Sequence, residues 1–324
     1  MFPYQISIVV PAYNEAESLP ELCQWIEQVM QKNQFSYEII IIDDGSSDNT
    51  WQVVGQIARK NDLVKGIAFN RNYGKSAALH TGFQKASGEV VITMDADLQD
   101  DPEEIPELYR MIKEEQYDLV SGWKQKRQDP LSKTVPTKLY NAVTRWFSGI
   151  PLHDFNCGLK AYRNRVVKSI EVYGEMHRYI PVIAKAAGFK AIAEKKVQHH
   201  PRKYGTTKFG LERFLFGFLD LLSITFVTKF RKRPMHFFGG FGVLSFLLGF
   251  LITIFVIAEK IISIYQKTSY RNITEQPLFY LALIAMVVGV QLFTAGFIGE
   301  MIITNSSKTQ EYIISDSVGF EAKI

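Results

Sequence analysis

Short apolar segments alternate with helix-like segments along the first 121 residues, and this alternation leaves few folds open to the chain. Five apolar segments have the length and composition of buried strands; they cover residues 6–10, 37–42, 64–69, 90–94 and 118–121. The segments between them read as helices; they cover residues 18–32, 50–59, 75–86 and 102–115. Strands that alternate with helices form parallel sheets with right-handed crossovers. We therefore predict a Rossmann-like α/β domain built on a mostly parallel sheet.

Carboxylates stand where the fourth apolar segment ends. Residues 88–101 read GEVVITMDADLQDD, so a buried strand runs directly into Asp95, Asp97, Gln99 and Asp100. Unpaired carboxylates are costly to bury, which indicates a strand end at the mouth of a cleft. In an extended chain Asp95 and Asp97 point to one side, where they suit Mg²⁺ or Mn²⁺ with diphosphate oxygens completing the shell. The structural alternative, a helix start with acids that complement the helix dipole, explains Asp100 but not Asp95 and Asp97.

Two further polar clusters follow earlier strands. They are Pro11-Ala12-Tyr13-Asn14-Glu15 and Asp43-Asp44-Gly45-Ser46-Ser47-Asp48. Because ligands of such sheets bind beyond the carboxyl ends of the strands, we expect these clusters to meet in one pocket. Tyr13 offers a ring on which a base can stack, Glu15 and Asp44 can accept hydrogen bonds from a nucleoside, and Lys75 can meet a phosphate near a helix start. Ordinary turns with helix caps and a solvated lysine are the alternative reading.

The three motifs, in this order, resemble those of the inverting family-2 glycosyltransferases with the GT-A fold. The resemblance covers about residues 5–230, and it is nearest to the branch of dolichol-phosphate mannose synthase and the polyprenyl-phosphate glucose synthases. It implies that Asp95, Asp97 and Gln99 hold the metal and that the acceptor is a lipid phosphate. The residues that we expect to bind the nucleotide sugar are Pro11, Ala12, Tyr13, Asn14, Glu15, Asp43, Asp44, Lys75, Asp95 and Ala96.

Basic residues between positions 122 and 208 offer the several donors that an acceptor phosphate needs. The predicted contacts are Lys124, Arg127, Lys133, Thr137, Arg202 and Lys208. Residues 202–208 resemble the Arg-x-x-Gly-(Ser/Thr)-Lys loop of the family, with one additional residue before the lysine. Many members have Gly-Ser-Arg where residues 122–124 read Gly-Trp-Lys, so the role of Lys124 is left open between a phosphate contact and a solvated basic loop.

Asp154 occupies the position at which the family carries a carboxylate on the acceptor side of the cleft. We predict Asp97 and Asp154 as catalytic residues, with Asp154 orienting or receiving the nucleophile; a turn aspartate that bonds local backbone is the alternative. A phosphate monoester has a second pKa of about 6, so its oxygen is already anionic and a strong general base is not required. Catalysis would then come from positioning and from metal stabilisation of the leaving diphosphate.

The composition excludes some other classes. A net charge of +4 is too small to predict a nucleic-acid partner. The two cysteines, Cys23 and Cys157, lack metal-ligand spacing, and with no secretory leader at the start they read as reduced cytosolic thiols. The pair His199-His200 reads as structural. Oligomeric state stays open, with a homo-oligomer among the alternatives.

Two uncharged segments in the last third are long enough to span a membrane, residues 237–258 and 278–299. Buried helices of a soluble core are the weaker alternative. The basic residues of 229–233 precede the first span and predict that this end lies in the cytosol. Residues 209–228 carry charges within an apolar segment, which favours a helix lying on the bilayer. We also expect a short strand at residues 311–314.

These observations predict four parts: a cytosolic GT-A catalytic domain over 1–208, juxtamembrane amphipathic helices over 209–233, a two-helix anchor over 234–303 and a cytosolic tail over 304–324. The resemblance favours an integral protein of a bacterial inner membrane. Its predicted reaction is metal-dependent, inverting transfer of a hexose from a nucleotide-diphosphate sugar to polyprenyl phosphate.

UDP-glucose is the first donor to consider, with GDP-mannose, galactose, an N-acetylhexosamine or an aminopentose as alternatives. A processive polysaccharide synthase is a rival, but Ala142 stands where its Gln-x-x-Arg-Trp segment would have glutamine, and two spans are too few for a polymer channel. The rival from another class is a non-catalytic membrane protein that binds nucleotide sugar.

Overall fold

The computed structural model describes residues 2–125, 141–146, 148–174, 176–204, 234–267, 272–305 and 314–319. The chain divides into two compact units. One comprises Met1–Thr225 together with Gln310–Ile324, and the other comprises Phe226–Thr309. The two units are described separately below.

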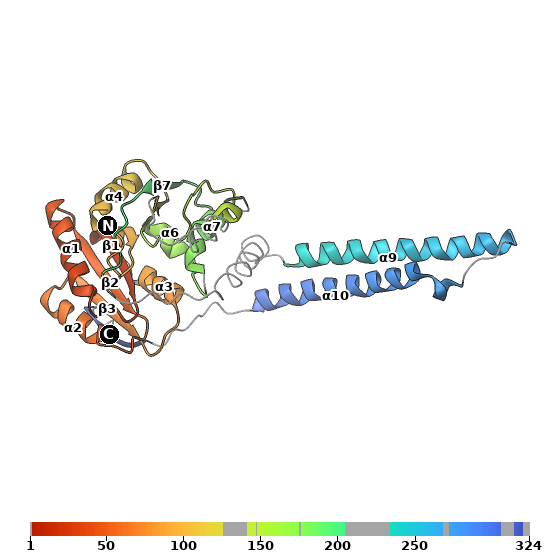
Figure 1. The fold of residues 1–324 in the computed structure, drawn as a ribbon, viewed down its shortest axis with the longest axis horizontal. Helices are drawn as coiled ribbons and strands as arrows, with labels where there is room; N and C mark the ends of the chain where they lie inside the picture. The colour runs from red at the N-terminus through yellow and green to blue at the C-terminus, as the bar shows by residue number, and fades with distance from the viewer. Residues whose placement is uncertain are drawn as a thin grey trace. The chain divides into compact units, whose positions relative to one another are not determined.

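The first unit is built on one mixed sheet (Figure 1). Its strands lie in the order β7-β5-β6-β4-β1-β2-β3-β8. Their bounds are β1 Tyr4–Ala12, β2 Tyr37–Asp43, β3 Val64–Phe69, β4 Gly88–Thr93, β5 Leu119–Trp123, β6 Lys160–Arg163, β7 Ile192–Lys196 and β8 Ile314–Val318. The pairs β1–β2, β1–β4, β2–β3 and β5–β7 are parallel, whereas β6 and β8 run antiparallel to their neighbours.

Helices cover both faces of this sheet. Their bounds are α1 Leu19–Lys32, α2 Thr50–Lys60, α3 Lys75–Lys85, α4 Ile105–Lys113, α6 Asn164–Ser169 and α7 Ile180–Ala186, with the 3-10 turns η1 Pro102–Glu104 and η2 Met176–Tyr179. Residues 141–146 are also helical. Alternate side chains of β1 divide between two cores: Ile8 packs on the side of α1, α2 and α4, and Val9 on the side of α3, α6 and α7. Burial on both faces explains why the strands are continuous apolar runs.

The five strands and four helices predicted up to residue 121 are confirmed, with differences of a few residues at their ends. The helix predicted over 102–115 is divided into η1 and α4. Pro106 has no N–H with which to bond the carbonyl of Pro102, so the α-helix begins only at Ile105. The sequence patterns did not predict β6 or β7, because these strands are only four and five residues long.

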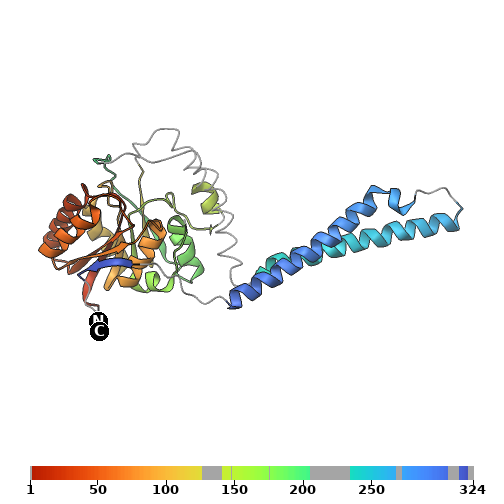
Figure 2. The same cartoon turned by 90° about the horizontal axis from the view of Figure 1, so that it is seen from below.

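The carboxyl-terminal strand differs from its prediction. Residues 311–313 lie outside the described residues, and the strand that the structure describes is Ile314–Val318. It pairs antiparallel with β3 of the same chain, and Figure 2 shows it in blue within the sheet of the first unit. The indole Nε1 of Trp51, in α2, donates to Asp316 at 3.1 Å. This strand covers what would otherwise be an open edge of the sheet.

The second unit is a pair of long helices, α9 (Pro234–Tyr265) and α10 (Pro277–Asn305), with a 3-10 turn η3 (Ile273–Glu275) before α10. Both helices are long and apolar enough to cross a membrane, and the predicted spans 237–258 and 278–299 lie within them. They pack closely where Gly242 faces Gly289, since a Cβ on either would come within 2.6–2.7 Å of the other's carbonyl oxygen. The bilayer-surface helix predicted over 209–228 lies outside the described residues.

Candidate active site

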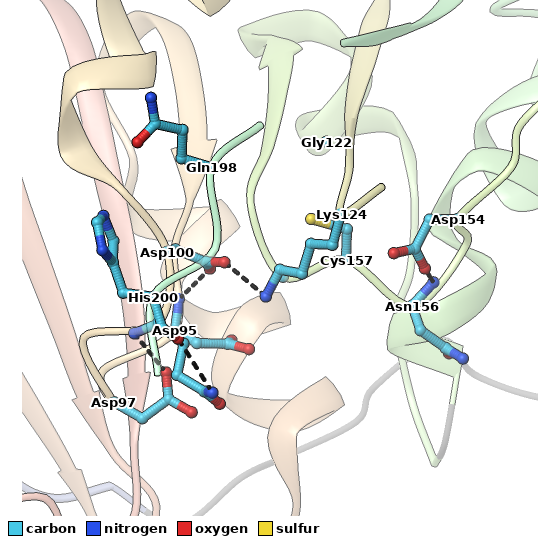
Figure 3. Close-up of polar contacts among 12 residues, drawn as sticks. Asp95, Asp97, Asp100, Gly122, Lys124, Asp154, Asn156, Cys157, Gln198 and His200 are labelled. Carbon is cyan, nitrogen blue, oxygen red and sulfur yellow. Dashed lines mark hydrogen bonds and ion pairs between the residues drawn. The ribbon is translucent and has the colours of Figure 1, made fainter. Parts of the chain in front are cut away.

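Three carboxylates gather where the chain leaves β4, and each is in contact with a cation. Lys75, at the start of α3, forms an ion pair with Asp95. Arg202 contacts Asp97 at 2.5 Å, and Lys124, just after β5, contacts Asp100 at 2.8 Å. Figure 3 shows Asp95, Asp97 and Asp100 on one loop, with the Lys124 amine directed at Asp100. Residues from four separate segments therefore meet at this strand end.

The loop after β4 is a turn rather than the extended chain that the sequence predicted. The β-strand ends at Thr93, and residues 96–98 form a turn in which Leu98 has φ of 61°. The Asp95 N–H donates to Asp100 Oδ2 at 3.2 Å, and the Gln99 N–H donates to Asp97 Oδ1 at 3.2 Å. The Asp97 and Asp100 carboxylates are thus held by hydrogen bonds within the loop, whereas the Asp95 carboxylate is held by Lys75.

The pKa values of the first two carboxylates move in opposite directions. Burial disfavours the charge of Asp95, but the cations Lys75 and Lys124 outweigh it and lower the pKa of Asp95. Burial and the negative charges of Asp95 and Asp100 raise the pKa of Asp97, against the opposing effect of Arg202. The site concentrates negative charge that another cation would stabilise.

Lys124 contacts the loop that carries Asp95 and Asp97 through its ion pair with Asp100. Its side chain is 11% exposed and that of Asp100 is fully buried, and the pKa of Lys124 is raised because the charge of Asp100 outweighs burial. The amine that the sequence offered as an acceptor-phosphate contact therefore bonds to Asp100 in this structure. Through Asp100 it holds the Asp95 backbone.

The residues present fit a divalent cation that takes only part of its ligands from the protein. Among the described residues, no group of three His, Cys, Asp or Glu side chains gathers as a closed metal site. A Cβ at Gly158 would come within 2.5 Å of the Asp95 carboxylate, so the glycine leaves the space that this side chain needs. Two carboxylates with an open approach suit Mg²⁺ or Mn²⁺ shared with a diphosphate.

The two earlier clusters form a second part of the same strand-end surface. Asn14 Oδ1 accepts from the Ser47 N–H at 2.8 Å, and the Asp44 N–H donates to the Ala12 carbonyl at 2.8 Å, so the motifs after β1 and β2 are joined. Tyr13 is 42% exposed, as a stacking ring requires. Glu15 accepts from the Ser18 hydroxyl at 2.7 Å.

The first two aspartates of the second cluster, Asp43 and Asp44, accept hydrogen bonds from backbone N–H groups in this structure. Asp44 accepts from the N–H groups of Tyr73 and Gly74 at 2.7 and 2.9 Å, and so fixes the loop that carries Lys75. Asp43 accepts from the Ser46 N–H at 3.0 Å. Burial raises the pKa of both carboxyls. Of the other predicted contacts, Pro11 lies within β1 and Ala96 is buried in the core.

Asp154 lies apart from the carboxylates of the β4 loop, with Lys124 and Cys157 between them in Figure 3. Its carboxylate accepts from the Asn156 N–H at 3.0 Å, and its own N–H donates to Glu194 at 3.0 Å. It is 2% exposed. The local backbone bond that the sequence offered as an alternative is therefore present. Four predicted acceptor contacts, Arg127, Lys133, Thr137 and Lys208, lie outside the described residues.

A small pocket beside Asp95 contains Lys75, which the sequence analysis predicted, and two charged residues that it missed, Lys160 and Arg178. Its polar lining includes Lys75, Asn156, Lys160, His177 and Arg178. A lysine between the apolar residues 159 and 161 was the available signal for Lys160, but nothing local indicated that 177–178 would approach it. The histidines at 199–200 read as structural. His200 Nε2 lies 3.0 Å from Asp101, and its ring packs against Trp25.

Comparisons with known proteins identify the family. The model of "Glycosyl transferase family 2" matches residues 7–171. A dodecaprenyl-phosphate galacturonate synthase from Rhizobium johnstonii is 33% identical over 92% of this chain and 87% of its own length. An undecaprenyl-phosphate 4-deoxy-4-formamido-L-arabinose transferase from Shewanella sediminis is 36% identical over 92% of this chain and 86% of its own.

Solved structures support the fold. A glucosyl-3-phosphoglycerate synthase from Mycobacterium tuberculosis, crystallised with Mn²⁺, uridine-diphosphate-glucose and phosphoglyceric acid, has a TM-score of 0.54 at 18% identity, covering 70% of this chain and 80% of that one. A mannosyl-3-phosphoglycerate synthase from Rubrobacter xylanophilus has a TM-score of 0.57 at 15% identity, with 69% and 74% covered. Sequence and fold agree that this chain is a glycosyltransferase and belongs to glycosyl transferase family 2.

Proposed function

We propose that this glycosyltransferase moves a sugar from a nucleotide-diphosphate donor to a polyprenyl phosphate. The observation that carries the proposal is the strand-end site, in which Asp95 and Asp97 face Lys75 and Arg202. Carboxylates that can share a cation with a diphosphate, flanked by basic side chains that can pair with its phosphates, suit a leaving nucleoside diphosphate. The polyprenyl-phosphate acceptor is supported by the names of the two relatives, which match over most of their length.

The reaction needs one bond to form and one to break. An anionic oxygen of the acceptor phosphate attacks C1 of the sugar, and the bond from C1 to the diphosphate breaks with its electron pair. Because attack comes from the face opposite the leaving group, the configuration at C1 inverts. The phosphate is already ionised near neutral pH, so Asp154 needs only to orient the acceptor side of the site.

Asp95, Asp97 and the Gln99 amide would hold Mg²⁺ or Mn²⁺. A bound cation would supply charge stabilisation to the departing diphosphate. Lys75 and Arg202, which form ion pairs with these two carboxylates, lie where their charges could also pair with the phosphates. Asp44 keeps the Lys75 loop in place, and Tyr13 presents its exposed ring to the base.

We infer that the enzyme is a membrane protein with its catalytic part over residues 1–208 in the cytosol of a bacterium. The two apolar helices of the second unit support an anchor over 234–303, and the basic residues of 229–233 support the orientation. Such an anchor would keep the transferase at the leaflet where the head group of a polyprenyl phosphate lies.

The decisive experiment is a donor panel. Detergent-purified protein is incubated with Mn²⁺, undecaprenyl phosphate and UDP- or GDP-linked sugars, and sugar in the organic phase is measured. UDP-glucose, which the sequence favours, is compared with GDP-mannose and with donors of galacturonate and of 4-deoxy-4-formamido-arabinose. Lipid-linked sugar from one donor class is expected; absence of transfer from every donor would contradict the proposal.

The matched variant is Asp97→Asn, which keeps the shape of the side chain and removes its charge. We expect lipid-linked product to fall by about 10²-fold or more with an unchanged unfolding midpoint, because the metal-binding charge is lost. Glu103→Asn is the control, since Glu103 lies on η1 with half of its side chain exposed. Unchanged turnover in Asp97→Asn would remove the metal site from the mechanism.

A further inference from the structure

A stacked histidine lies at the carboxyl edge of the sheet, and the proposed mechanism does not use it. The rings of His153 and Trp123 have centroids 4.2 Å apart and planes inclined by 14°. Trp123 is the last residue of β5. Because β4 and β5 both pair antiparallel with β6, they run in the same direction, and their carboxyl ends lie at one edge. His153 therefore lies at the edge where such sheets bind their ligands.

Glu194, in β7, holds this ring in place. Its Oε2 lies 2.7 Å from the His153 Nδ1, and its Oε1 accepts from the backbone N–H groups of His153 and Asp154 at 2.7 and 3.0 Å. An ionised carboxylate only accepts hydrogen bonds, so the proton of the ring contact is on Nδ1. The other ring nitrogen, Nε2, is then the atom that can meet a ligand.

His153 and Asp154 differ in how far a ligand can reach them. The side chain of His153 is 51% exposed, whereas Asp154 is 2% exposed and its carboxylate accepts from the Asn156 N–H. Holding a half-exposed side chain in one orientation costs conformational entropy. The stack on Trp123 and the contact with Glu194 meet that cost, and they leave Nε2 preorganised on an accessible ring.

Two short connections relate this ring to the carboxylates of the β4 loop. Trp123 is followed directly by Lys124, whose ammonium contacts Asp100 at 2.8 Å. A Cβ added at Gly158, five residues after the histidine, would come within 2.5 Å of the Asp95 carboxylate. The segment that carries the histidine therefore reaches the candidate metal site at its other end.

The accessible groups beside the ring favour an anionic ligand. Lys196, the last residue of β7, is exposed, and its amine lies 5.3 Å from the centroid of the Trp123 ring. The Glu194 side chain is only 10% exposed, and the hydrogen bonds that it accepts compensate its charge. A ligand at this edge would therefore meet His153 and Lys196 rather than the carboxylate, and both can donate to a phosphate.

We propose that His153 binds the acceptor, with Nε2 sharing one proton with an oxygen of the lipid phosphate. This inference rests on the transferase function proposed above. A monoanionic phosphate gives its remaining O–H proton to the neutral ring, and the electron pair of that bond stays on the oxygen that attacks C1. A dianionic phosphate meets a ring that already holds the proton. In both cases the proton leaves Nε2 for water after transfer, and Glu194 acts as the positioning residue.

His153→Asn separates this role from a structural one. The shorter amide can keep the bond from the Nδ1 position to Glu194, but it has no atom at the position of Nε2. We expect KM for undecaprenyl phosphate to rise by at least about 10-fold, as the loss of a charge-assisted hydrogen bond allows. KM for the sugar donor and the melting midpoint should not change. If His153 only holds its loop, His153→Asn will keep the acceptor KM of the wild type, and the inference is wrong.

His153→Gln is the rescue variant, because the longer amide can place its nitrogen near the position of Nε2 while losing the bond to Glu194. It should recover part of the acceptor affinity that His153→Asn loses, whereas a structural role predicts the reverse order of the two variants. His80→Asn is the matched control. The His80 ring, in α3, also has a partner at Nδ1, the Val172 N–H at 3.5 Å, and its replacement should leave both KM values unchanged.

A binding measurement separates this inference from the function on which it rests. Farnesyl phosphate is titrated into the full chain in detergent, and nuclear magnetic resonance follows the isotope-labelled ring nitrogens of His153, identified by their absence in His153→Asn. A saturable shift at Nε2 is expected even if no donor gives lipid-linked product. Transfer without such a shift would refute the inference and leave the function standing, and absence of both would refute both. An equal shift with inorganic phosphate or with UDP at the same concentration would show that the site is not specific for the acceptor, and the assignment would be wrong.

Discussion

At the scale of single residues, Glu38 shows how a buried charge stabilises this fold. It is fully buried in β2, where it accepts from the hydroxyls of Ser7 and Ser87 at 2.6 Å and pairs with Lys65 at 2.8 Å. Burial opposes its ionisation, but these donors outweigh burial and lower the pKa of Glu38 below the ordinary value of 4.5. The charged form is therefore the one that the folded state favours.

Glu38→Gln is expected to lower the free energy of unfolding of the first unit by about 2 kcal/mol near neutral pH, because the amide cannot form the ion pair with Lys65. Because the pKa of Glu38 is lower in the folded state than in the unfolded state, its charge stabilises the folded state fully above pH 4.5. This stabilisation is lost progressively as the pH falls below 4.5 and through the folded-state pKa. The difference in melting midpoint between wild type and variant should therefore shrink below pH 4.5. Glu103→Gln, at an exposed site, should show neither effect; an equal loss there would contradict the assignment.

Gly158 is a second residue at which a substitution should have a large effect, because an added Cβ would meet a side chain of the candidate active site. A Cβ would lie 2.5–2.7 Å from three atoms of the Asp95 carboxylate, so Gly158→Ala must displace that side chain. We expect kcat for transfer to fall by about 10²-fold, with a small change in melting midpoint, because displacing a positioned ligand by about 1 Å is enough. Gly55→Ala in α2, which meets nothing within 4 Å, should keep activity and raise stability by about 1 kcal/mol.

At the scale of elements, β8 is the part of the sheet most remote in sequence from its neighbour. Ending the chain after residue 313 would expose the edge of β3 and remove the Asp316 partner of Trp51. We expect the melting midpoint, measured by tryptophan fluorescence, to be lower than that of the wild type. We also expect the truncated protein to aggregate through the open edge. Ending the chain after residue 319 retains β8 and should behave as wild type. Equal midpoints for both truncations would show that β8 adds no stability.

The helix pair α9 and α10 depends on a close approach of two backbones. A side chain at Gly289 would meet the Gly242 carbonyl at 2.7 Å, whereas Gly240 has open space around it. Gly289→Leu should therefore separate the helices and lower the SDS fraction at which their structure is lost, as circular dichroism can record, since small residues permit such packing. Gly240→Leu should leave the transition unchanged; a similar shift in both variants would argue against this contact.

At the scale of the whole molecule, the proposed orientation can be tested with thiols. Both native cysteines are buried, so an engineered exposed cysteine can be labelled selectively. A membrane-impermeant maleimide should label Thr274→Cys, in η3 between the two helices, in intact cells. Glu103→Cys, in the catalytic unit, should be labelled only after lysis. The opposite pattern would reverse the proposed topology and place the site away from the cytosolic donor.

The sequence determined the α/β fold, the strand ends at which the site forms and the two apolar helices, because each depends on local patterns: apolar runs, helix starts and uncharged length. Asp95, Asp97 and Lys75 could be selected as site residues because they follow strands or a glycine turn.

Only the tertiary structure decided what surrounds them. Three contacts show this: Lys124 pairs with Asp100, β8 returns to β3, and Arg178 lines the same pocket as Lys160. They join residues that lie between 18 (Lys160 and Arg178) and 252 (Gly66 and Val318) positions apart in the sequence. Such contacts are fixed by packing on the sheet, and no local pattern carries that information.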